Sequence, residues 1–373
     1  MKNFIVSIVL PFLLFAEGPK EHYLVVGTYT GGKSEGIYIY KFNSEDGSFK
    51  AISHVKTPNP SYVAISPDEK FVFAVTEGAN DGNGGAISSF YFDKANGTLS
   101  FINKQPTNGD HPCYVDIDKT GKWVFAGNYS SGSLSAIPVN PDGTLGISAI
   151  VVKHSGTGKN PERQEKPHVH CTIVSPDNKF LYVPDLGIDK VMIYSIDVVS
   201  GKLTAANQPF AASTPGAGPR HLTFHPNGKY AYLVEELTGH VVVFQMLNGQ
   251  LKSLQRISTL PKAQKGYPGS ADIHVSPDGK FLYASNRGDF NNLAIFKVDS
   301  NSGKLTIAGF QSTLGKTPRN FNFDPTGNFL LVGNQESDEI VIFKRNLKTG
   351  LLEDTKKRIE VGKPVCLKWA AVE

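Results

Sequence analysis

The chain has 373 residues, of which 40% are hydrophobic and 19% are charged, and its formal net charge is only +4. Lysine and arginine are spread through the turns and not gathered in a stripe, so the sequence gives little support for nucleic-acid binding. The 37 glycines and 23 prolines suit a soluble, turn-rich, all-β protein, and three cysteines, an odd number, argue against a disulfide framework.

The first residues differ in kind from the rest of the chain. Met1-Lys2-Asn3 precedes an apolar run from Phe4 to Phe15, which ends beside the small residue Ala16. A basic start, a short hydrophobic core and a small residue are the features of a secretory signal, and the run is short for a membrane span. We therefore expect residues 1–16 to be a signal peptide and the protein to be periplasmic or extracellular. The alternative is a cytoplasmic protein whose first residues form a strand.

From Tyr23 onwards the chain repeats a unit of about fifty residues. Each unit has a short apolar strand, a turn of the type Ser-Pro-Asp-Gly-Lys, an aromatic-led second strand, and two more strands joined by an X-Gly dipeptide. The turns lie at residues 66–71, 118–123, 175–180, 225–230, 276–281 and 324–329, and a seventh second strand is Tyr23 to Gly27. The glycine of each dipeptide supplies the positive φ of a tight hairpin. Seven units of four antiparallel strands predict an all-β, seven-bladed β-propeller, one domain over residues 17–373.

The ends of the chain predict how the ring closes. The final copy of the first strand, Val365 to Ala370, has no second strand after it because the chain ends. The missing second strand is Tyr23 to Gly27 at the other terminus. We expect these two strands to pair and close the ring, which leaves no free sheet edge and ties down both ends.

Blade geometry selects the candidate site. The first strand of a blade lines the central channel and the second runs antiparallel beside it, so first-strand starts and second-strand ends lie on one face of the disc. Charge at these positions concentrates in neighbouring blades, on His170, Arg220, Glu236 and Arg287. Cations for an anionic substrate stand there beside an imidazole and a carboxylate that can move a proton. Further candidates for substrate binding at the same positions are His168, His221, Arg319, Gln335, Asn128, Tyr29 and Asp185.

Other interpretations of these residues stay open. Arg220 and Glu236 sit on adjacent strands and could form a plain ion pair. The longest polar detour of the chain, Lys153 to Lys166, predicts either a loop that covers the site or an uninvolved surface loop.

Two metal hypotheses arise, and neither is our expectation. His168 and His170 resemble a pair of zinc ligands, but no third ligand stands at a recognised spacing from them. Asp185 with Glu235, Glu236 and Asp289 could hold calcium. We expect no metal and no cofactor.

At these residues the sequence resembles the lactonase family typified by bacterial 6-phosphogluconolactonase of the seven-bladed propeller type, to which the fungal carboxy-cis,cis-muconate cyclase also belongs. The resemblance covers about Tyr23 to Trp369 and is specific through the order and blade positions of its motifs. The matching stretches are Pro167-His168-Val169-His170, Val183-Pro184-Asp185-Leu186-Gly187, Gly218-Pro219-Arg220-His221, Glu235-Glu236-Leu237, Ser285-Asn286-Arg287, Pro318-Arg319 and Gly333-Asn334-Gln335.

The resemblance implies a site made of a histidine, two arginines and a glutamate. By motif these fall on His170, Arg220, Arg287 and Glu236, although His168 could also be the histidine. It implies hydrolysis of a sugar lactone by direct attack of water, because no nucleophile elbow is present. A lactonizing cyclase and a non-catalytic, ligand-binding propeller are the alternatives. We expect a monomer whose partner is a sugar lactone or sugar acid, with no nucleic acid and no membrane span in the mature chain.

Overall fold

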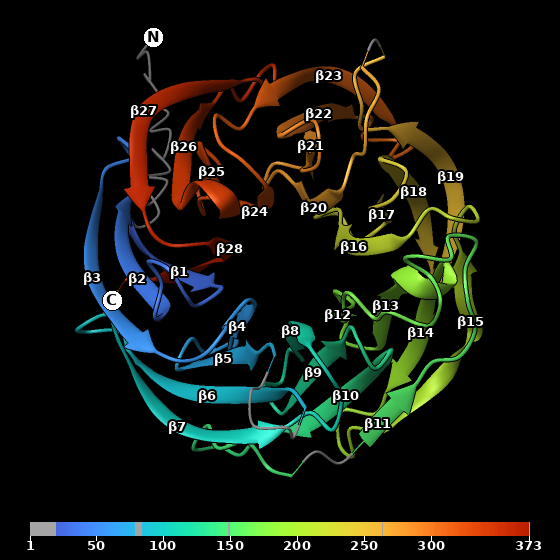
Figure 1. Ribbon diagram of the computed structural model, residues 1–373, viewed down its shortest axis with the longest axis horizontal. Helices are drawn as coiled ribbons and strands as arrows, with labels where there is room; N and C mark the ends of the chain where they lie inside the picture. Colours follow the sequence, from blue (N-terminus) through green and yellow to red (C-terminus); the bar gives the residue numbers. More distant parts are fainter. Residues whose placement is uncertain (1–19, 79–83, 148–149, 263, 373) are drawn as a thin grey trace, which may run out of the picture.

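The computed structural model describes residues 20–78, 84–147, 150–262 and 264–372. These residues form seven four-stranded antiparallel sheets that stand like blades around a central channel (Figure 1). The predicted fold, a seven-bladed β-propeller with four strands in each blade, is confirmed. The expected signal peptide, residues 1–16, lies outside the described residues.

Each blade runs outwards from the channel in chain order, except that the first blade takes its innermost strand from the C-terminus. The first blade contains β28 (Pro364–Ala371), β1 (Glu21–Thr28), β2 (Gly36–Asn43) and β3 (Phe49–Lys56). The second blade contains β4 (Val63–Ile65), β5 (Phe71–Thr76), β6 (Ala86–Asp93) and β7 (Thr98–Pro106), and the third contains β8 (Pro112–Ile117), β9 (Trp123–Asn128), β10 (Ser133–Pro138) and β11 (Ile150–Lys153). The fourth contains β12 (Ile173–Val174), β13 (Phe180–Asp185), β14 (Lys190–Ile196) and β15 (Leu203–Ala212), and the fifth contains β16 (Pro219–Phe224), β17 (Tyr230–Glu235), β18 (His240–Leu247) and β19 (Gln250–Ser258). The sixth contains β20 (Ser270–Val275), β21 (Phe281–Asn286), β22 (Asn292–Val298) and β23 (Leu305–Ser312), and the seventh contains β24 (Pro318–Phe323), β25 (Phe329–Asn334), β26 (Glu339–Arg345) and β27 (Leu352–Glu360). Two 3₁₀ turns, η1 (Leu186–Ile188) and η2 (Gln335–Ser337), follow β13 and β25.

The ring closes as the chain ends predict. Strand β28 pairs antiparallel with β1 in a register that sets Leu24 opposite Trp369 and Val26 opposite Leu367. The N-terminal and C-terminal parts of the chain therefore share one sheet, in which β1 is paired on both sides and β28 is the innermost strand at the channel.

The repeated turn is held by the first residue of its motif. Ser66 Oγ donates a hydrogen bond to Asp68 Oδ1 (2.7 Å) and accepts one from the N–H of Phe71 (2.9 Å). Asp118 does the same work in its blade, since its Oδ1 accepts from the N–H of Trp123 (2.9 Å). A short side-chain acceptor at this position satisfies backbone N–H groups of the turn, which explains why serine and aspartate recur there.

The hairpin glycines also join neighbouring blades. A Cβ on Gly143 would lie 2.2 Å from the Phe71 ring of the preceding blade, and one on Gly201 would lie 2.5 Å from Trp123. The same contact joins Gly47 to Phe329, Gly97 to Tyr23, Gly249 to Phe180, Gly303 to Tyr230 and Gly350 to Phe281. Glycine is thus required twice, for the positive φ of the turn and for the close approach of the aromatic ring.

One predicted strand is largely replaced by irregular backbone. After Pro167 only Ile173–Val174 forms a regular strand, with an isolated bridge from Val169 to Asp185. The carboxylate of Asp185 accepts the N–H of His168 (2.7 Å), which removes that N–H from the strand ladder. This segment still runs antiparallel to β13, because the Leu186 N–H donates to the His168 carbonyl (2.9 Å).

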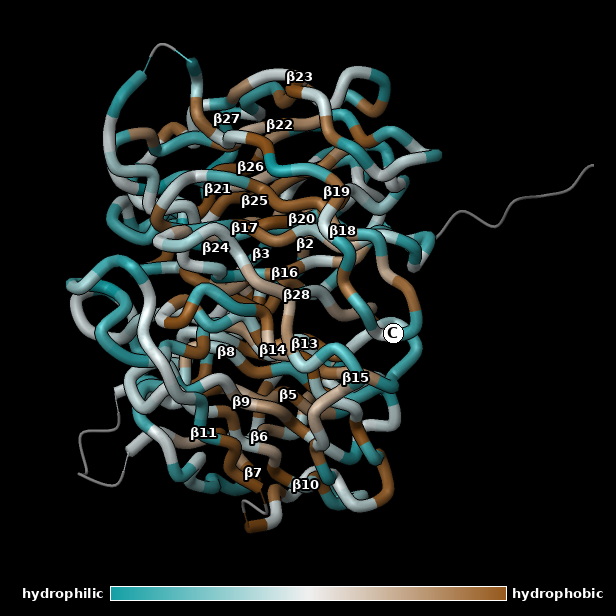
Figure 2. The backbone as a smooth tube through the Cα atoms, turned by 90° about the vertical axis from the view of Figure 1, so that its right-hand side faces the viewer, coloured by the Kyte–Doolittle hydropathy of each residue, from teal (hydrophilic) through white to brown (hydrophobic). Residues whose placement is uncertain are grey.

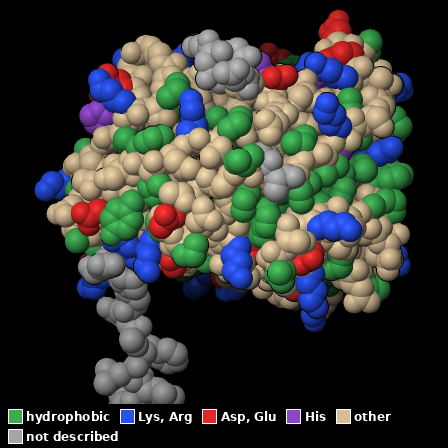
Figure 3. Space-filling view, turned by 90° about the horizontal axis from the view of Figure 1, so that it is seen from below, with side chains coloured by type: hydrophobic (Ala, Val, Ile, Leu, Met, Phe, Trp, Pro, Cys, Tyr) green, Lys and Arg blue, Asp and Glu red, His purple; other side chains and the backbone are tan. Residues whose placement is uncertain are grey.

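Apolar residues follow the strands and polar residues gather in the loops at both faces of the disc (Figure 2). On the side drawn in Figure 3, lysine and arginine side chains are interspersed with aspartate and glutamate, without a basic stripe. Among the described residues, no helix has the length and apolarity to cross a membrane.

Candidate active site

At the end of the second strand of a blade, two successive side chains point to opposite sides of the blade. After β17, Glu236 reaches the Nε of Arg220 in the channel (2.9 Å). Its neighbour Glu235 instead reaches Arg256 on the outermost strand β19 (2.8 Å). This alternation decides which of the predicted residues can take part in a channel site.

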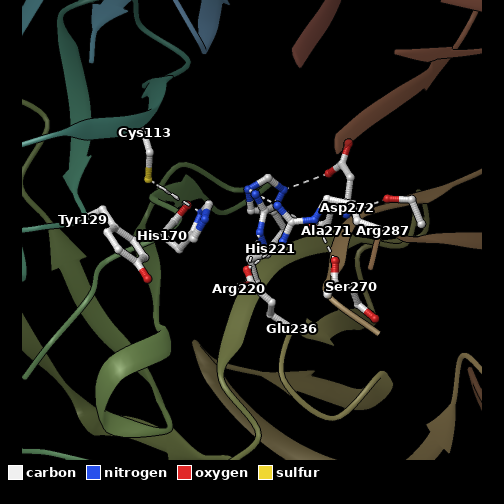
Figure 4. A network of polar contacts seen from close by, with 12 residues as sticks. Cys113, Tyr129, His170, Arg220, His221, Glu236, Ser270, Ala271, Asp272 and Arg287 are labelled. Atoms are coloured by element: carbon white, nitrogen blue, oxygen red, sulfur yellow. Dashed lines mark hydrogen bonds and ion pairs between the residues drawn. The ribbon is translucent and has the colours of Figure 1, made fainter. Parts of the chain in front are cut away.

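Glu236 is the centre of the charged cluster. Its Oε2 accepts from Arg220 Nε (2.9 Å) and pairs with Arg287 Nη2 (3.2 Å), while its Oε1 pairs with Arg163 Nη2 (2.8 Å). The hydroxyl of Tyr267 also points at Oε1, at 3.4 Å. The structure thus brings together Arg220, Glu236 and Arg287 (Figure 4), three of the four residues predicted to be catalytic. It adds Arg163 to them.

The three guanidinium groups keep the glutamate ionised. Burial alone would raise the pKa of Glu236, but Arg287, Arg220 and Arg163 outweigh burial and hold that pKa at about 2. Burial in turn lowers the pKa of Arg287 to about 10, against the opposing effect of Glu236. A carboxylate in this environment is a weak base and a strong anchor for arginine.

Arg220 is fixed on its other side by a histidine–aspartate pair. Its side chain is 1% exposed, and Nη1 donates to the Ala271 carbonyl and to His221 Nε2 (3.2 Å). His221 Nδ1 donates to Asp272 Oδ1 (2.8 Å), so both ring nitrogens are occupied. Burial, followed by the charge of Arg220, lowers the pKa of His221 to about 3. His221, predicted to bind substrate, therefore has its ring nitrogens engaged by Arg220 and Asp272.

His170 lies beside this chain of contacts. Its ring packs edge-on against His221 (centroids 5.3 Å apart) and Tyr129 (5.4 Å), and Nδ1 lies 3.7 Å from Cys113 Sγ. Burial lowers the pKa of His170 well below the ordinary value of 6.5, and Arg220 adds to the effect. The imidazole is therefore neutral at pH 7, and the same burial makes it a weaker base than an ordinary histidine.

His168 has a different environment. Its ring stacks on Tyr129 (centroids 4.4 Å apart), with Nδ1 3.0 Å from the Tyr129 carbonyl and Nε2 3.1 Å from Glu165. Both ring nitrogens of His168 are thus engaged, which makes His170 the better candidate for the catalytic histidine.

The opposite side of the channel mouth carries a second polar group. Tyr29 donates its hydroxyl to Glu77 (2.9 Å), which also accepts from the hydroxyl of Ser61. The guanidinium of Arg319 lies over the Tyr29 ring, 5.3 Å from its centroid. Tyr29 and Arg319 therefore share the predicted face, whereas Gln335 begins η2 and donates to its neighbour Glu336 (2.8 Å).

Two of the residues predicted to bind substrate are fully buried and point away from the channel, so the structure does not place them in the charged cluster. Asn128 is fully buried within its own blade and donates to Ser133 (3.1 Å) and Ser135 (2.9 Å). Asp185 is also fully buried and accepts from His168, Gly187 and His154. Both occupy the strand-end position that faces away from the channel, where Asp185 holds loop N–H groups and Asn128 holds side chains of β10.

The carboxylates of the calcium hypothesis do not come together in the channel. Asp185 and Glu235 face away from the channel and have their own partners, and Asp289 accepts from the backbone N–H of Tyr267 (2.7 Å). Within the described part of the chain, no three His, Cys, Asp or Glu side chains are grouped to hold a metal ion.

Sequence reasoning did not select Arg163 or Tyr267 as site residues. Both lie outside the strands, in the segments before β12 and β20, where no strand register predicts the direction in which a side chain points. Arg163 donates to the hydroxyl groups of Tyr267 (2.9 Å) and Tyr129 (3.3 Å) as well as to Glu236. Of the two predictions for the polar detour, the loop that covers the site is the one the contacts of Arg163 support.

Comparison with known proteins identifies the family and agrees with the propeller fold. The family model described as Lactonase, 7-bladed beta-propeller, matches residues 23–369. The chain belongs to this family. The matched span is the same stretch over which the sequence motifs of the family were found.

Curated relatives and solved structures cover nearly the whole chain. A 6-phosphogluconolactonase of Bacillus subtilis is 38% identical over 92% of this chain and 97% of its own, and one of Formosa agariphila is 37% identical over 91% and 97%. The solved structure of a periplasmic gluconolactonase of Pseudomonas aeruginosa is 40% identical, with a TM-score of 0.89 over 95% of this chain and all of that one.

Proposed function

We propose that this protein is a lactonase that hydrolyses a sugar lactone to the sugar acid. The observation that carries the proposal is the set of Arg220, Arg287 and Glu236 in direct contact at the channel mouth, with His170 beside it, in a lactonase-family propeller. The set offers fixed cations for developing negative charge and a neutral imidazole for a proton.

Arg287 is the proposed partner of the lactone carbonyl. Its Nε is held by the Gly269 carbonyl (2.7 Å) and its Nη2 by Glu236, so the orientation of the guanidinium is set before substrate arrives. Its side chain is 16% exposed, against 1% for Arg220, so Arg287 is the more accessible of the two. The more deeply buried Arg220 adds positive charge beside Arg287, and Glu236 holds both guanidinium groups in place.

His170 is the proposed general base. Water attacks the carbonyl carbon and gives a proton to the imidazole, and the tetrahedral oxyanion is stabilised by the arginines. The bond from the carbonyl carbon to the ring oxygen then breaks, and the ring oxygen takes the proton back from the imidazolium. Glu236 is unsuited to the base role, because both of its carboxylate oxygens are already paired with arginines.

A panel of sugar lactones tests the proposal. We expect the purified protein to open δ-gluconolactone or its 6-phosphate well above the spontaneous rate, with acid release followed at constant pH. The excess is expected to vanish in Glu236→Gln and Arg287→Ala. No excess on any lactone of the panel would refute the proposal.

We also propose that the protein is exported. The proposal rests on the basic start, apolar run and small residue within residues 1–16, and the name of the Pseudomonas aeruginosa relative includes the word periplasmic. Expression with and without residues 1–16, followed by cell fractionation, tests it. The full chain is expected outside the cytoplasm, and recovery of both forms in the cytoplasm would contradict export.

A further inference from the structure

The segment of residues 154–166, here called the roof segment, is anchored firmly at both ends. His154 donates to Asp185 (2.6 Å) near its start. Near its end the fully buried Gln164 donates to the Leu186 carbonyl (2.8 Å) and to Asp189 (2.7 Å), and accepts the N–H of Asn160 (2.9 Å). With buried polar anchors on both sides, the roof segment holds a defined position over the channel mouth.

Arg163 extends from the roof segment to three separate blades or their loops. It contacts Tyr129 after β9, Glu236 after β17 and Tyr267 before β20. The fourth blade, which carries His168 and His170, lies between the first and second of these contacts in the ring. Arg163 therefore covers the side of the mouth that holds the charged cluster.

The positive charge of the three arginines exceeds the negative charge of Glu236. Arg220 and Arg287 already set two positive charges against one carboxylate, and Arg163 makes three against one, a surplus of two. The side chain of Arg163 is 35% exposed, compared with 1% for Arg220 and 16% for Arg287. Arg163 is thus the arginine of the cluster that faces an incoming molecule most openly, and its planar fork suits phosphate or carboxylate oxygens.

We propose that Arg163 is a substrate-binding residue that recognises a second anionic group, a phosphate or a carboxylate, on the sugar. The inference rests on the proposed lactonase function and deepens it, since it assigns different roles to the three arginines. Arg220 and Arg287 act at the ring ester, while Arg163 selects lactones that carry an additional negative charge.

Calorimetric binding of three sugar acids tests the inference without requiring turnover. The probes are gluconate, 6-phosphogluconate and glucarate, measured on the wild type, Arg163→Gln, Arg163→Lys and the control Lys159→Ala, an exposed position of the same segment. Loss of a hydrogen bond to a charged group is expected to weaken 6-phosphogluconate or glucarate about tenfold or more in Arg163→Gln. Gluconate binding is expected to change less than about threefold, with partial recovery in Arg163→Lys and none of these losses in Lys159→Ala.

The outcomes separate this inference from the proposed function. A loss confined to 6-phosphogluconate or to glucarate supports the inference and identifies the anion. Equal weakening of all three acids, or no weakening, overturns it, because Arg163 would then only position Glu236 or do nothing for binding. If no lactone is opened but the selective loss is seen, the proposed function fails and the binding role of Arg163 stands.

Discussion

Replacement of Glu236 by glutamine tests the electrostatic core of the site. The change keeps the shape of the side chain but removes the charge that faces three arginines at 2.8, 2.9 and 3.2 Å. The difference between the ordinary glutamate pKa of 4.5 and about 2 corresponds to roughly 3 kcal/mol, at about 1.4 kcal/mol per pH unit. This agrees with the loss of about 3–5 kcal/mol expected when one partner of a buried ion pair is removed.

The expected effect on thermal stability follows from the size of the protein. With an unfolding entropy of about 2 cal/mol/K per residue over 373 residues, roughly 3 kcal/mol lowers Tm by about 4 °C. Because the folded-state pKa is depressed, the stabilisation is present above the unfolded pKa and is lost as the pH falls from 4.5 towards about 2. Scanning calorimetry of wild type and Glu236→Gln at pH 7 and at pH 3 measures both effects.

The neighbouring glutamate provides a matched control. Burial raises the pKa of Glu235 despite the opposing effect of Arg256, so its charge is already disfavoured in the fold. Glu235→Gln is therefore expected to change stability by less than about 1 kcal/mol and to leave lactone opening intact. A Tm of Glu236→Gln equal to or above that of the wild type, or equal losses in the two variants, would refute the reasoning.

Three further predictions concern the base, the positioning pair and the ring. His170→Gln is expected to lower kcat about 10²–10⁴-fold, and because burial lowers the pKa of His170, the acid limb of wild-type kcat/KM should lie below pH 6.5; an acid limb above pH 6.5 would contradict this. His221→Asn frees Arg220 on one side and is expected to reduce kcat while KM stays within about threefold, so steady-state kinetics that show only a raised KM would exclude a positioning role. Deletion of residues 364–373 removes β28 and exposes the edge of β1, so a shift towards aggregates is expected in size-exclusion chromatography, and a monomer with unchanged Tm would count against ring closure as a source of stability.

The repeat predicted the fold and the face of the disc on which the charged cluster lies. Each of its residues has a local physical role, as with Ser66 in the turn and Gly143 against Phe71, so copies can be aligned without knowledge of distant contacts. The substitutions that depart from the repeat at Arg220, Glu236 and Arg287 then stood out, and the structure brings these residues into direct contact.

The remaining differences have specific physical causes. The alternation of side chains along a strand distinguishes Asn128 from Tyr129. Asn128 was predicted to bind substrate and Tyr129 was not, yet it is Tyr129 that packs against His170, while Asn128 bonds within its own blade. Arg163 lies in an irregular segment, where the path depends on the anchor Gln164 beneath η1 and not on a period of the sequence. His221 occupies a channel position, yet its contact with Asp272 from the next blade turns it into a support for Arg220.

The most direct test of the account is the rate of acid release from δ-gluconolactone and its 6-phosphate, with wild type and Arg287→Ala compared at constant pH. The account predicts turnover well above spontaneous hydrolysis on at least one of them, reduced about 10²–10³-fold in the variant, as expected for loss of a donor to the oxyanion. Wild-type rates equal to the spontaneous rate, or full activity in Arg287→Ala, would contradict it.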